Sequence, residues 1–297
     1  MASSPAISAI VCTYRRPDLL VGTLASLAPQ QDGHEVIVVD NDAGGSARAT
    51  VAEFAGVRYH HEPRAGLSYA RNAGIAAARG RVMAFLDDDA RAAPDFLARV
   101  ALAFETVTPR PACVGGRVMP LYEAPRPAWF ADELLGYLSL VDWSPAPMFL
   151  GERRWLAGTN IAIDAAALER VGRFSPRLGR TGANLLSNEE ISLQHRLRRA
   201  GLPVYYDPSI VVHHLVPAER LTRRWLWRRA FWQGISDARS DREEERDGWP
   251  RLGLKAAMAA VAVSRVAARA VLGRPTASAE CRVLSSAGYL VGVYGAP

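Results

Sequence analysis

Residues 82–89 read VMAFLDDD, a run of apolar side chains followed by three aspartates. A short, continuous apolar run with a polar end is typical of a strand that is buried on both faces, as in a parallel sheet. Carboxylates that directly follow such a strand are hard oxygen ligands, and Mg²⁺ takes one or two of them together with substrate phosphates. The run therefore predicts an α/β fold with a divalent cation at this strand end.

Two other interpretations of the aspartate triplet (Asp87, Asp88 and Asp89) compete with a metal site. The triplet can be a solvated acidic turn in front of the next helix. Dehalogenase-type phosphatases also carry Asp-x-Asp after an apolar strand, but they normally have Thr or Val two residues after the second Asp, where this chain has Arg91. The phosphatase is therefore disfavoured, and the acidic turn stays open.

Strand and helix patterns alternate on both sides of this run. They are strand-like runs at 6–12, 35–39 and 57–59, and helical stretches at 17–27, 46–55, 67–79 and 94–105. Repeated βα units imply a mainly parallel sheet with helices on both faces. Because ligands of such sheets bind at the carboxyl ends of the strands, we expect Asp40, which ends the second strand, to lie near the triplet.

The rest of the chain has weaker periodicity. Its segments are a stretch rich in proline and aromatic residues at 120–150, a strand or extended segment at 155–163, strands at 204–206 and 210–214, and a helix at 188–199. From residue 219 onward the pattern is helical. We therefore expect an α/β domain at 1–217 and a helical C-terminal appendage at 218–297.

Composition limits the class of protein. Hydrophobic residues make up 49% of the 297 residues, which is enough for a substantial core and excludes a disordered chain. The net charge of +6 comes from arginine far more than from lysine. Such a surplus suits phosphate-bearing substrates, nucleic acid or an anionic membrane, and codon bias toward arginine explains it equally well.

Three features favour a cytoplasmic protein. The cysteines, Cys12, Cys113 and Cys281, are odd in number and far apart, which indicates a reducing compartment. The N-terminal segment lacks the basic region and the long apolar run of a signal peptide. The longest weakly polar stretch, 252–272, is interrupted by three cations and is not expected to span a membrane.

No glycine-rich phosphate loop of the G-x-G-x-x-G or Walker A kind occurs in the sequence, so a nucleotide would be held by side chains at strand ends. Seven other motifs follow one another: VCTYR (11–15), VVDN (38–41), GLSYARN (66–72), FLDDD (85–89), GTNIA (158–162), NEEISL (188–193) and VVHH (211–214). In this order they resemble the family 2 glycosyltransferases of GT-A fold, over about residues 6–235. Each motif alone is weak, but seven in order are hard to obtain by chance.

The resemblance implies an inverting, metal-dependent enzyme of the hexosyltransferase class. It would move a sugar from a nucleotide sugar, with UDP as the expected carrier, to an acceptor hydroxyl. The domain at 1–217 would be catalytic, with a nucleotide-binding half at about 1–110 and an acceptor half at about 111–217. The alternative is a non-catalytic nucleotide- or glycan-binding protein of the same fold, which the acidic triplet and Glu190 disfavour.

The resemblance also implies residue roles. The nucleotide would be bound by Thr13, Tyr14, Arg15, Asp40, Arg71, Asp87 and Asp88. Within this set Asp40 would accept a hydrogen bond from uracil, and Arg71 would lie near the diphosphate. The metal, Mn²⁺ or Mg²⁺, would be held by Asp89 and His214. The acceptor or the sugar would contact Asn160 and Trp155.

At 189–190 the chain has Glu-Glu where the family usually has Glu-Asp, whose second member is the base. The resemblance therefore makes Glu190 the group that takes the proton from the acceptor hydroxyl, with Glu189 beside it. Because glutamate is one methylene longer than aspartate, its reach to the acceptor can differ. The alternative is that both acids only complement the dipole of a helix N-terminus.

Residues 220–232 interleave arginine with tryptophan and phenylalanine. We favour a helix that packs its tryptophans, Trp225 and Trp227 among them, on the catalytic domain, with arginines near the acceptor or the diphosphate. A helix lying on anionic lipid at the inner face of the membrane is the second option. Nucleic acid is not an expected partner, because no motif for reading it is present. A homodimer is left open.

Overall fold

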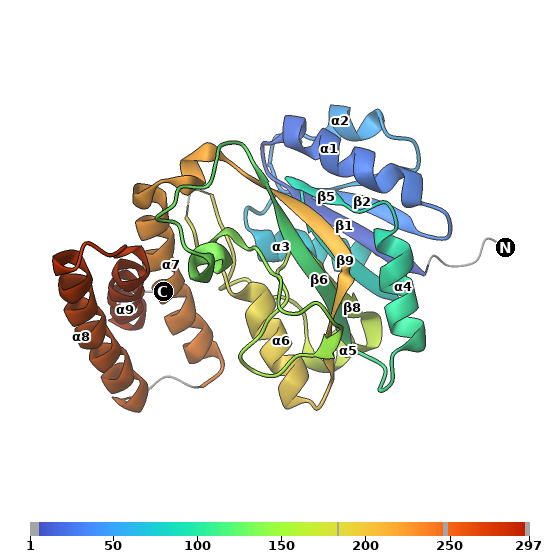
Figure 1. Cartoon of the computed structure of the whole chain (residues 1–297). Coiled ribbons are helices and arrows are strands. Elements are labelled where there is room, and N and C mark those ends of the chain that lie inside the picture. The colour runs from blue at the N-terminus through green and yellow to red at the C-terminus, as the bar shows by residue number, and fades with distance from the viewer. Residues whose placement is uncertain (1–5, 183, 246–248, 295–297) are drawn as a thin grey trace. The chain divides into compact units, whose positions relative to one another are not determined.

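The computed structural model of the chain describes residues 6–182, 184–245 and 249–294 (Figure 1). Its elements fall into two compact units. The sheet unit comprises Met1–Leu121, Ser139–Pro176 and Glu190–Leu215, and the helical unit comprises Tyr122–Leu138, Arg177–Glu189 and Val216–Pro297. The helical unit therefore takes in two segments from the middle of the chain in addition to the C-terminal helices.

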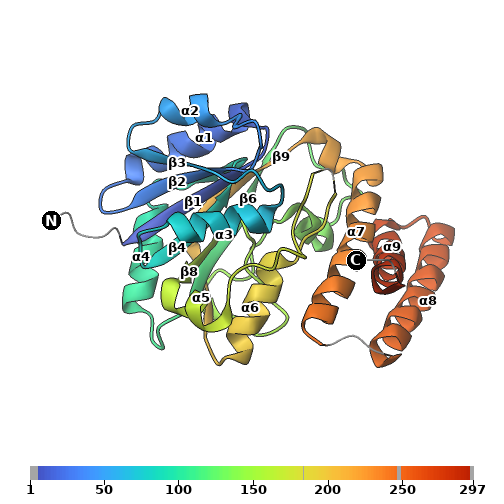
Figure 2. The same ribbon diagram turned by 180° about the vertical axis from the view of Figure 1, so that it is seen from behind.

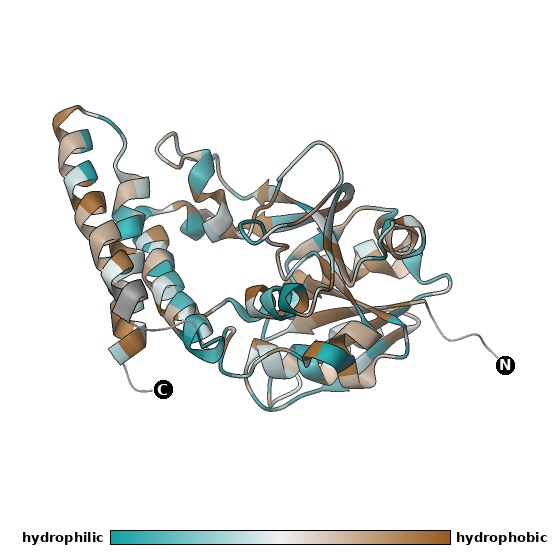
Figure 3. Ribbon diagram, turned by 90° about the horizontal axis from the view of Figure 1, so that it is seen from below, coloured by the Kyte–Doolittle hydropathy of each residue, from teal (hydrophilic) through white to brown (hydrophobic). Residues whose placement is uncertain are grey.

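The strands nearest the N-terminus form the parallel half of the sheet. They are β1 (Ile7–Thr13), β2 (Glu35–Asp40), β3 (Val57–His61) and β4 (Val82–Asp87), in the order β3-β2-β1-β4. Every residue of β1 and β2 is buried, which explains why both read as continuous apolar runs. In Figure 3 the strand next to the N-terminal trace is correspondingly brown. The parallel pairing predicted from the βα repeats is confirmed.

Helices cover both faces of this parallel half (Figure 2). α3 (Leu67–Ala77) lies on one face, where Gly74 packs on the side chains of Ile10 and Val39 so closely that a Cβ would overlap them. α1 (Pro17–Leu27) and α4 (Phe96–Thr106) supply apolar side chains to the core on the other face. The short helix α2 (Arg48–Ala52) follows β2.

The second half of the sheet contains antiparallel pairs. Its strands are β5 (Ala90–Ala92), β6 (Cys113–Tyr122), β7 (Met148–Phe149), β8 (Ile161–Asp164) and β9 (Val204–Val216). They continue from β4 in the order β8-β6-β9-β5, and β7 also pairs with β9. β8 runs antiparallel to β4 and β6, and β9 runs antiparallel to β5 and β7. The sheet thus changes from parallel to antiparallel beside the strand that carries the triplet.

Two predicted strands differ in extent from the observed ones. Segments 204–206 and 210–214 form one strand, β9, because the chain stays extended through Pro208 while Asp207 accepts a local hydrogen bond from the Ser209 N–H (2.8 Å). In the segment 155–163, for which a strand or an extended segment was predicted, the strand begins only at Ile161. The backbone before Ile161 pairs with a side chain and not with a neighbouring strand. The Leu156 N–H donates to the Gln194 side-chain oxygen (2.8 Å), and the Leu156 carbonyl accepts from the Gln194 side-chain nitrogen (2.9 Å).

Two helices follow the antiparallel strands. α5 (Ala165–Val171) begins directly after Asp164, whose carboxylate accepts a hydrogen bond from the Ala166 N–H (2.9 Å). This is an N-cap, which satisfies a free backbone donor of the first turn. α6 (Glu189–Arg199) coincides with the helix predicted at 188–199.

The helical unit contains α7 (Arg223–Glu243), α8 (Trp249–Val271) and α9 (Ala277–Tyr294), with short 3-10 turns at Asp132–Leu138 and Ala218–Leu221. α7 and α9 cross closely at glycines: Gly234 abuts the backbone of Ser285, and Gly288 abuts the backbone of Phe231. Among the described residues, none of the helices is long and apolar enough to cross a membrane.

Candidate metal and donor site

The aspartate triplet lies at the carboxyl end of β4, in the tight connection to β5. Asp87 is the last residue of β4, and β5 starts directly after Asp89. β5 pairs with the end of β9, so that Ala90 lies opposite His214, and the Leu215 N–H donates to the Asp89 carbonyl (2.9 Å). This pairing brings a histidine from far along the chain to the triplet.

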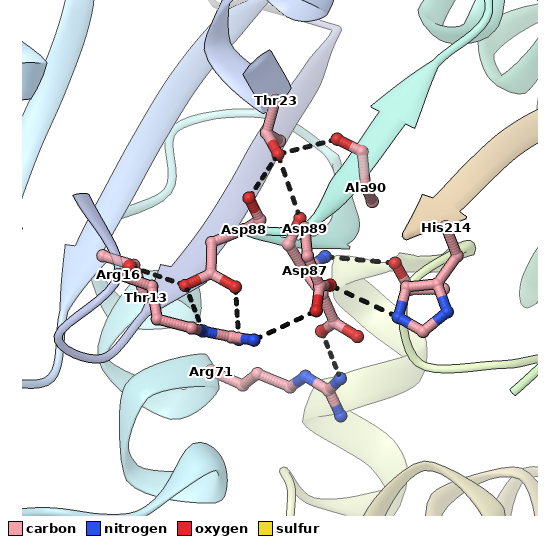
Figure 4. Close-up of polar contacts among 10 residues, drawn as sticks. Thr13, Arg16, Thr23, Arg71, Asp87, Asp88, Asp89, Ala90 and His214 are labelled. Carbon is pink, nitrogen blue, oxygen red and sulfur yellow. Dashed lines mark hydrogen bonds and ion pairs between the residues drawn. The ribbon is translucent and has the colours of Figure 1, made fainter. Parts of the chain in front are cut away.

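Asp87, Asp89 and His214 form a cluster that fits a divalent cation (Figure 4). One ligand atom of each lies within 4.8 Å of the others. The His214 Nε2 is 3.3 Å from the Asp89 Oδ1, and both side chains are almost fully buried. Two carboxylates and an imidazole are a donor set that suits Mn²⁺ and that leaves ligand positions for substrate oxygens. The described residues therefore bring together Asp89 and His214, the two residues expected at the metal, and add Asp87.

Asp88 faces away from this cluster, toward the end of β1. Its carboxylate accepts a hydrogen bond from the Thr13 hydroxyl (2.7 Å) and forms an ion pair with Arg16. Burial raises the pKa of Asp88 to about 7, against the opposing effect of the Arg16 charge. The Thr23 hydroxyl lies 2.7 Å from the carbonyl oxygen of Asp88. Asp88 thus fixes the backbone of the triplet to β1 and α1.

Two arginines offset the negative charge of the triplet. Arg16 extends from Asp88 to Asp89, with its Nη1 3.0 Å from the Asp89 Oδ2. Arg71, from α3, is almost fully buried and lies 3.5 Å from the Asp87 carboxylate. Its guanidinium lies over the ring of Phe174 and occupies the space where a Cβ at Gly158 would stand. A side chain at Gly158 of the GTNIA motif would therefore displace the Arg71 guanidinium from this position.

The end of β2 carries a second acidic group. Asp40 is fully buried, and its carboxylate accepts hydrogen bonds from the N–H of Asp42 (3.1 Å) and of Ala47 (2.7 Å) and from the Tyr59 hydroxyl (3.1 Å). These contacts hold the turn after β2. That Asp40 also reads the nucleotide base stays a prediction.

Tyr14 and Arg15 lie in the turn after β1. Arg15 has a φ of 56°, in the left-handed region that a non-glycine residue enters only at a cost of about 1–2 kcal/mol. Its side chain is mostly exposed, stacks over the Tyr14 ring and donates to Asp42 (2.8 Å). That hydrogen bond lowers the pKa of Asp42. The turn therefore presents an exposed arginine, paired with the buried Asp42, beside the strand ends.

The two glutamates stand at the first turn of α6. Glu189 is buried and Glu190 is half-buried. The preceding Asn188 has a φ of 77°, and its amide bonds the side chains of Asp237 (2.9 Å) and Gln233 (2.8 Å) of α7. The chain thus enters the helix through a strained residue that two side chains hold.

The two residues expected at the acceptor or the sugar have other contacts. The Asn160 amide donates to the carbonyls of Arg117 (2.8 Å) and Ile210 (3.1 Å), so it links strands of the sheet. Trp155 is half-buried, and its ring meets that of Trp143 edge-on at 5.9 Å. A role of either residue in substrate binding stays a prediction.

Arg16, Thr23 and Asp42 were not among the residues expected at the site. The sequence held a signal for two of them: Arg16 directly follows the VCTYR motif, and Asp42 directly follows VVDN. Thr23 lies inside the helical pattern of α1, where nothing in the sequence distinguishes it.

The chain is similar to known glycosyltransferases. The Glycosyl transferase family 2 model matches residues 8–174. Succinoglycan biosynthesis protein ExoM of Rhizobium meliloti (strain 1021) is 32% identical, over 96% of this chain and 92% of that protein. The glucosyl-dolichyl phosphate glucuronosyltransferase of Haloferax volcanii is 30% identical, over 77% of this chain and 75% of that protein.

Solved structures show the same fold. The mannosyltransferase PcManGT from Pyrobaculum calidifontis, in complex with GDP-Man and Mn²⁺, matches 100% of this chain and 89% of its own, with a TM-score of 0.65 and 19% identity. GalNAc-T7 with UDP, GalNAc and Mn²⁺ matches 80% of this chain and 52% of its own, with a TM-score of 0.54 and 15% identity.

Proposed function

Since this chain belongs to glycosyl transferase family 2 and has the GT-A fold, we propose that it is an inverting hexosyltransferase that uses a nucleotide sugar and a divalent metal. The donor would be a UDP-sugar and the acceptor a hydroxyl group. The cluster of Asp87, Asp89 and His214 next to two arginines carries this proposal. Binding of GDP-Man or UDP together with Mn²⁺ by the two structural neighbours supports it.

Asp89 and His214, with Asp87 beside them, would hold Mn²⁺ or Mg²⁺. When bound, the ion supplies a positive charge that stabilises the departing nucleoside diphosphate. Arg71 and Arg16 would add fixed positive charge at the same strand end. Fixed positive charges at the place where negative charge develops stabilise the transition state and so increase the rate.

The reaction would be a single displacement at the anomeric carbon. Glu190 would take the proton from the acceptor hydroxyl as that oxygen bonds to the anomeric carbon, and the bond to the diphosphate oxygen would break with its electron pair on the leaving group. At the N-terminal turn of α6 the helix dipole would favour a negatively charged side chain. Glu189 would orient the start of the helix.

The nucleotide would bind across the ends of β1, β2 and β4. Thr13, Tyr14, Arg15 and Asp40 would surround the base, as the family resemblance implies. The ribose would contact Asp87 or Asp88. Asn160 and Trp155 would contact the acceptor or the sugar. Within this proposal the catalytic domain is 1–217, and 218–297 is an appendage.

A metal-dependent release of nucleotide tests this function. UDP-sugars, GDP-sugars and dTDP-sugars are incubated with the enzyme and Mn²⁺, and the free nucleoside diphosphate is measured with and without excess chelator. We expect one UDP-sugar to be hydrolysed slowly and only with metal. Undiminished release in excess chelator would contradict the metal. Binding of a nucleotide sugar without turnover on any acceptor tested would instead favour the non-catalytic binding protein of the same fold.

The proposed function also includes the place in the cell where the enzyme acts. We propose a cytoplasmic enzyme that works at the inner face of the membrane, in keeping with the glucosyl-dolichyl phosphate in the name of the Haloferax volcanii relative. Formation of a homodimer would show as a doubled mass in solution by light scattering.

A further inference from the structure

α8 exposes an apolar surface. Of the exposed residues between 253 and 272 in the described chain, Ser264 and Arg265 alone have polar side chains, and the others are alanine, valine, leucine, methionine or glycine. Leu254 is 59% exposed and Leu272 is 65% exposed. The outer face of a helix on a soluble protein is normally charged or polar. An exposed apolar surface of this extent marks a site of interaction.

A neighbouring face of α8 already has its partner within the helical unit. α8 packs on α9 through a stripe that includes Lys255 and Ala262, spaced so that they lie on one face. The Lys255 ammonium lies over the Tyr289 ring (4.7 Å) and 3.6 Å from the Asp237 carboxylate. α8 thus packs small and cationic residues against α9 and leaves its larger apolar side chains exposed. Packing within the helical unit therefore does not explain why the exposed side chains are apolar.

The charges around this surface are positive. Residues 249–297 contain six cations and a single acid, Glu280, and that acid is bonded by Arg223, Thr276 and Trp227. Two of the cations, Arg265 of α8 and Arg282 of α9, line a pocket of about 220 Å³ whose other walls are the apolar face of α8. Guanidinium groups next to an apolar wall suit a phosphate headgroup attached to acyl chains.

We propose that α8 lies flat on an anionic lipid bilayer. The side chains of Leu254, Met258, Val261 and Leu272 enter the boundary between headgroups and acyl chains. Arg265 and Arg282 contact the lipid phosphates. A flat orientation is required because, among the described residues, no helix is suited to cross a membrane. Figure 3 shows the brown turns along the C-terminal helices that this contact would cover.

The proposed membrane contact lies on α8 and not on 220–232, the segment for which the sequence left a lipid contact open. From Arg223 onward that segment forms the start of α7, where Leu226 and Ala230 are buried and α9 packs on the helix. Trp227, which we expected to pack on the rest of the fold, is instead exposed (40%), and its indole N–H donates to Glu280 (2.8 Å). The inference goes beyond the proposed reaction and does not rest on it, because lipid binding is measured without donor, acceptor or metal.

Sedimentation with vesicles tests the proposal on the full chain. We expect the protein to pellet with vesicles that contain phosphatidylglycerol, to stay in solution with phosphatidylcholine alone, and to be released by salt, since added salt shortens the range of charge interactions. The double variant Met258→Ser/Val261→Ser and the charge variant Arg265→Glu/Arg282→Glu should each bind at least about tenfold more weakly.

Matched control variants show whether lipid binding depends on this surface of α8 or on exposed leucine and arginine side chains elsewhere. Leu102→Ser changes an exposed leucine of α4, and Arg153→Glu changes an exposed arginine of the sheet unit, and both should bind vesicles as the unchanged protein does. Unfolding temperatures verify that all variants fold, which their exposed positions favour. Wild-type vesicle binding by Met258→Ser/Val261→Ser would overturn the proposal. Failure of the unchanged protein to pellet with phosphatidylglycerol vesicles would also overturn it. If Met258→Ser/Val261→Ser then changed the oligomeric state, the face would bind a second copy instead of lipid.

Discussion

Three carboxylates in consecutive positions repel one another, and the chain offsets this charge in two directions. Asp88 is turned toward Thr13 and Arg16, while Asp87 and Asp89 remain on the side of His214 (Figure 4). The division separates a carboxylate that holds the backbone from two that can bind a cation. A substitution of Asp88 should therefore differ in its effect from a substitution of Asp87 or Asp89.

Asp89→Ala should abolish metal binding and turnover. The substitution removes a carboxylate from the cluster with His214, and loss of the ion's charge stabilisation, several kcal/mol, corresponds to at least about a 100-fold lower rate. Titration calorimetry with Mn²⁺ and steady-state rates measure both effects. Asp18→Asn, an exposed carboxylate on α1, is the control and should behave as the unchanged enzyme. Normal Mn²⁺ affinity in Asp89→Ala would remove this residue from the metal site.

Glu190→Gln should lower the rate of transfer by roughly 10²–10⁴-fold, because glutamine keeps the shape of the side chain and cannot accept the proton. Affinity for the nucleotide sugar should not change. Glu189→Gln should have a smaller effect, since successive residues of a helix point about 100° apart and only one of the pair can face the acceptor. Rates with a competent acceptor decide the assignment. An inactive Glu189→Gln beside a normal Glu190→Gln would shift the base by one residue.

The residues that meet at the site were predictable to different degrees. Asp87, Asp88 and Asp89 follow from a buried strand that ends in carboxylates. His214 follows only from the order of the family motifs, because its approach depends on the β5–β9 pairing, which the weak pattern at 90–92 does not predict. Arg16 could not be chosen over Arg15 from the sequence. The positive φ of Arg15 turns its side chain to Asp42 and leaves Arg16 facing the triplet.

At the scale of elements, prediction succeeded where burial imposes a pattern. β1, β2 and β4 were expected within a residue or two of their observed bounds, because strands buried on both faces contain little besides apolar side chains. The extents of β8 and β9 differ from the prediction. The side chains of Gln194 and Asp207 form hydrogen bonds that decide where β8 begins and how β9 continues, and hydrophobic periodicity does not reveal such bonds.

The crossing of α7 and α9 gives a prediction at the same scale. Gly288→Ala should destabilise the protein by about 1–3 kcal/mol, because a Cβ there would overlap the backbone of Phe231. Gly253→Ala on α8 is the matched control, since open space surrounds that position, and it should stabilise the helix by about 0.5–1 kcal/mol. Chemical denaturation monitored by circular dichroism measures both. Equal stability of the two variants would mean that the crossing adjusts without cost.

At the scale of the whole molecule, the candidate metal cluster and the residue before the two glutamates belong to different units. All three residues of the metal cluster and both arginines belong to the sheet unit. The residue that precedes the two glutamates, Asn188, belongs to the helical unit and is bonded there to α7. The binding of the donor should therefore be independent of the α7 contacts, whereas catalysis by Glu190 should depend on them.

Asp237→Ala on α7 tests this dependence. It removes the acceptor that holds Asn188, whose φ of 77° costs free energy and needs support from its neighbours. The start of α6 should then relax, and because small displacements of a reacting group are costly, kcat for transfer should fall by about 10-fold or more while affinities for Mn²⁺ and the nucleotide sugar stay the same. Asp95→Ala removes an exposed carboxylate of comparable charge from the sheet unit and should change neither quantity. If Asp237→Ala weakens donor binding as much as it lowers kcat, the α7 contacts support the whole site, and the separation of tasks between the units fails.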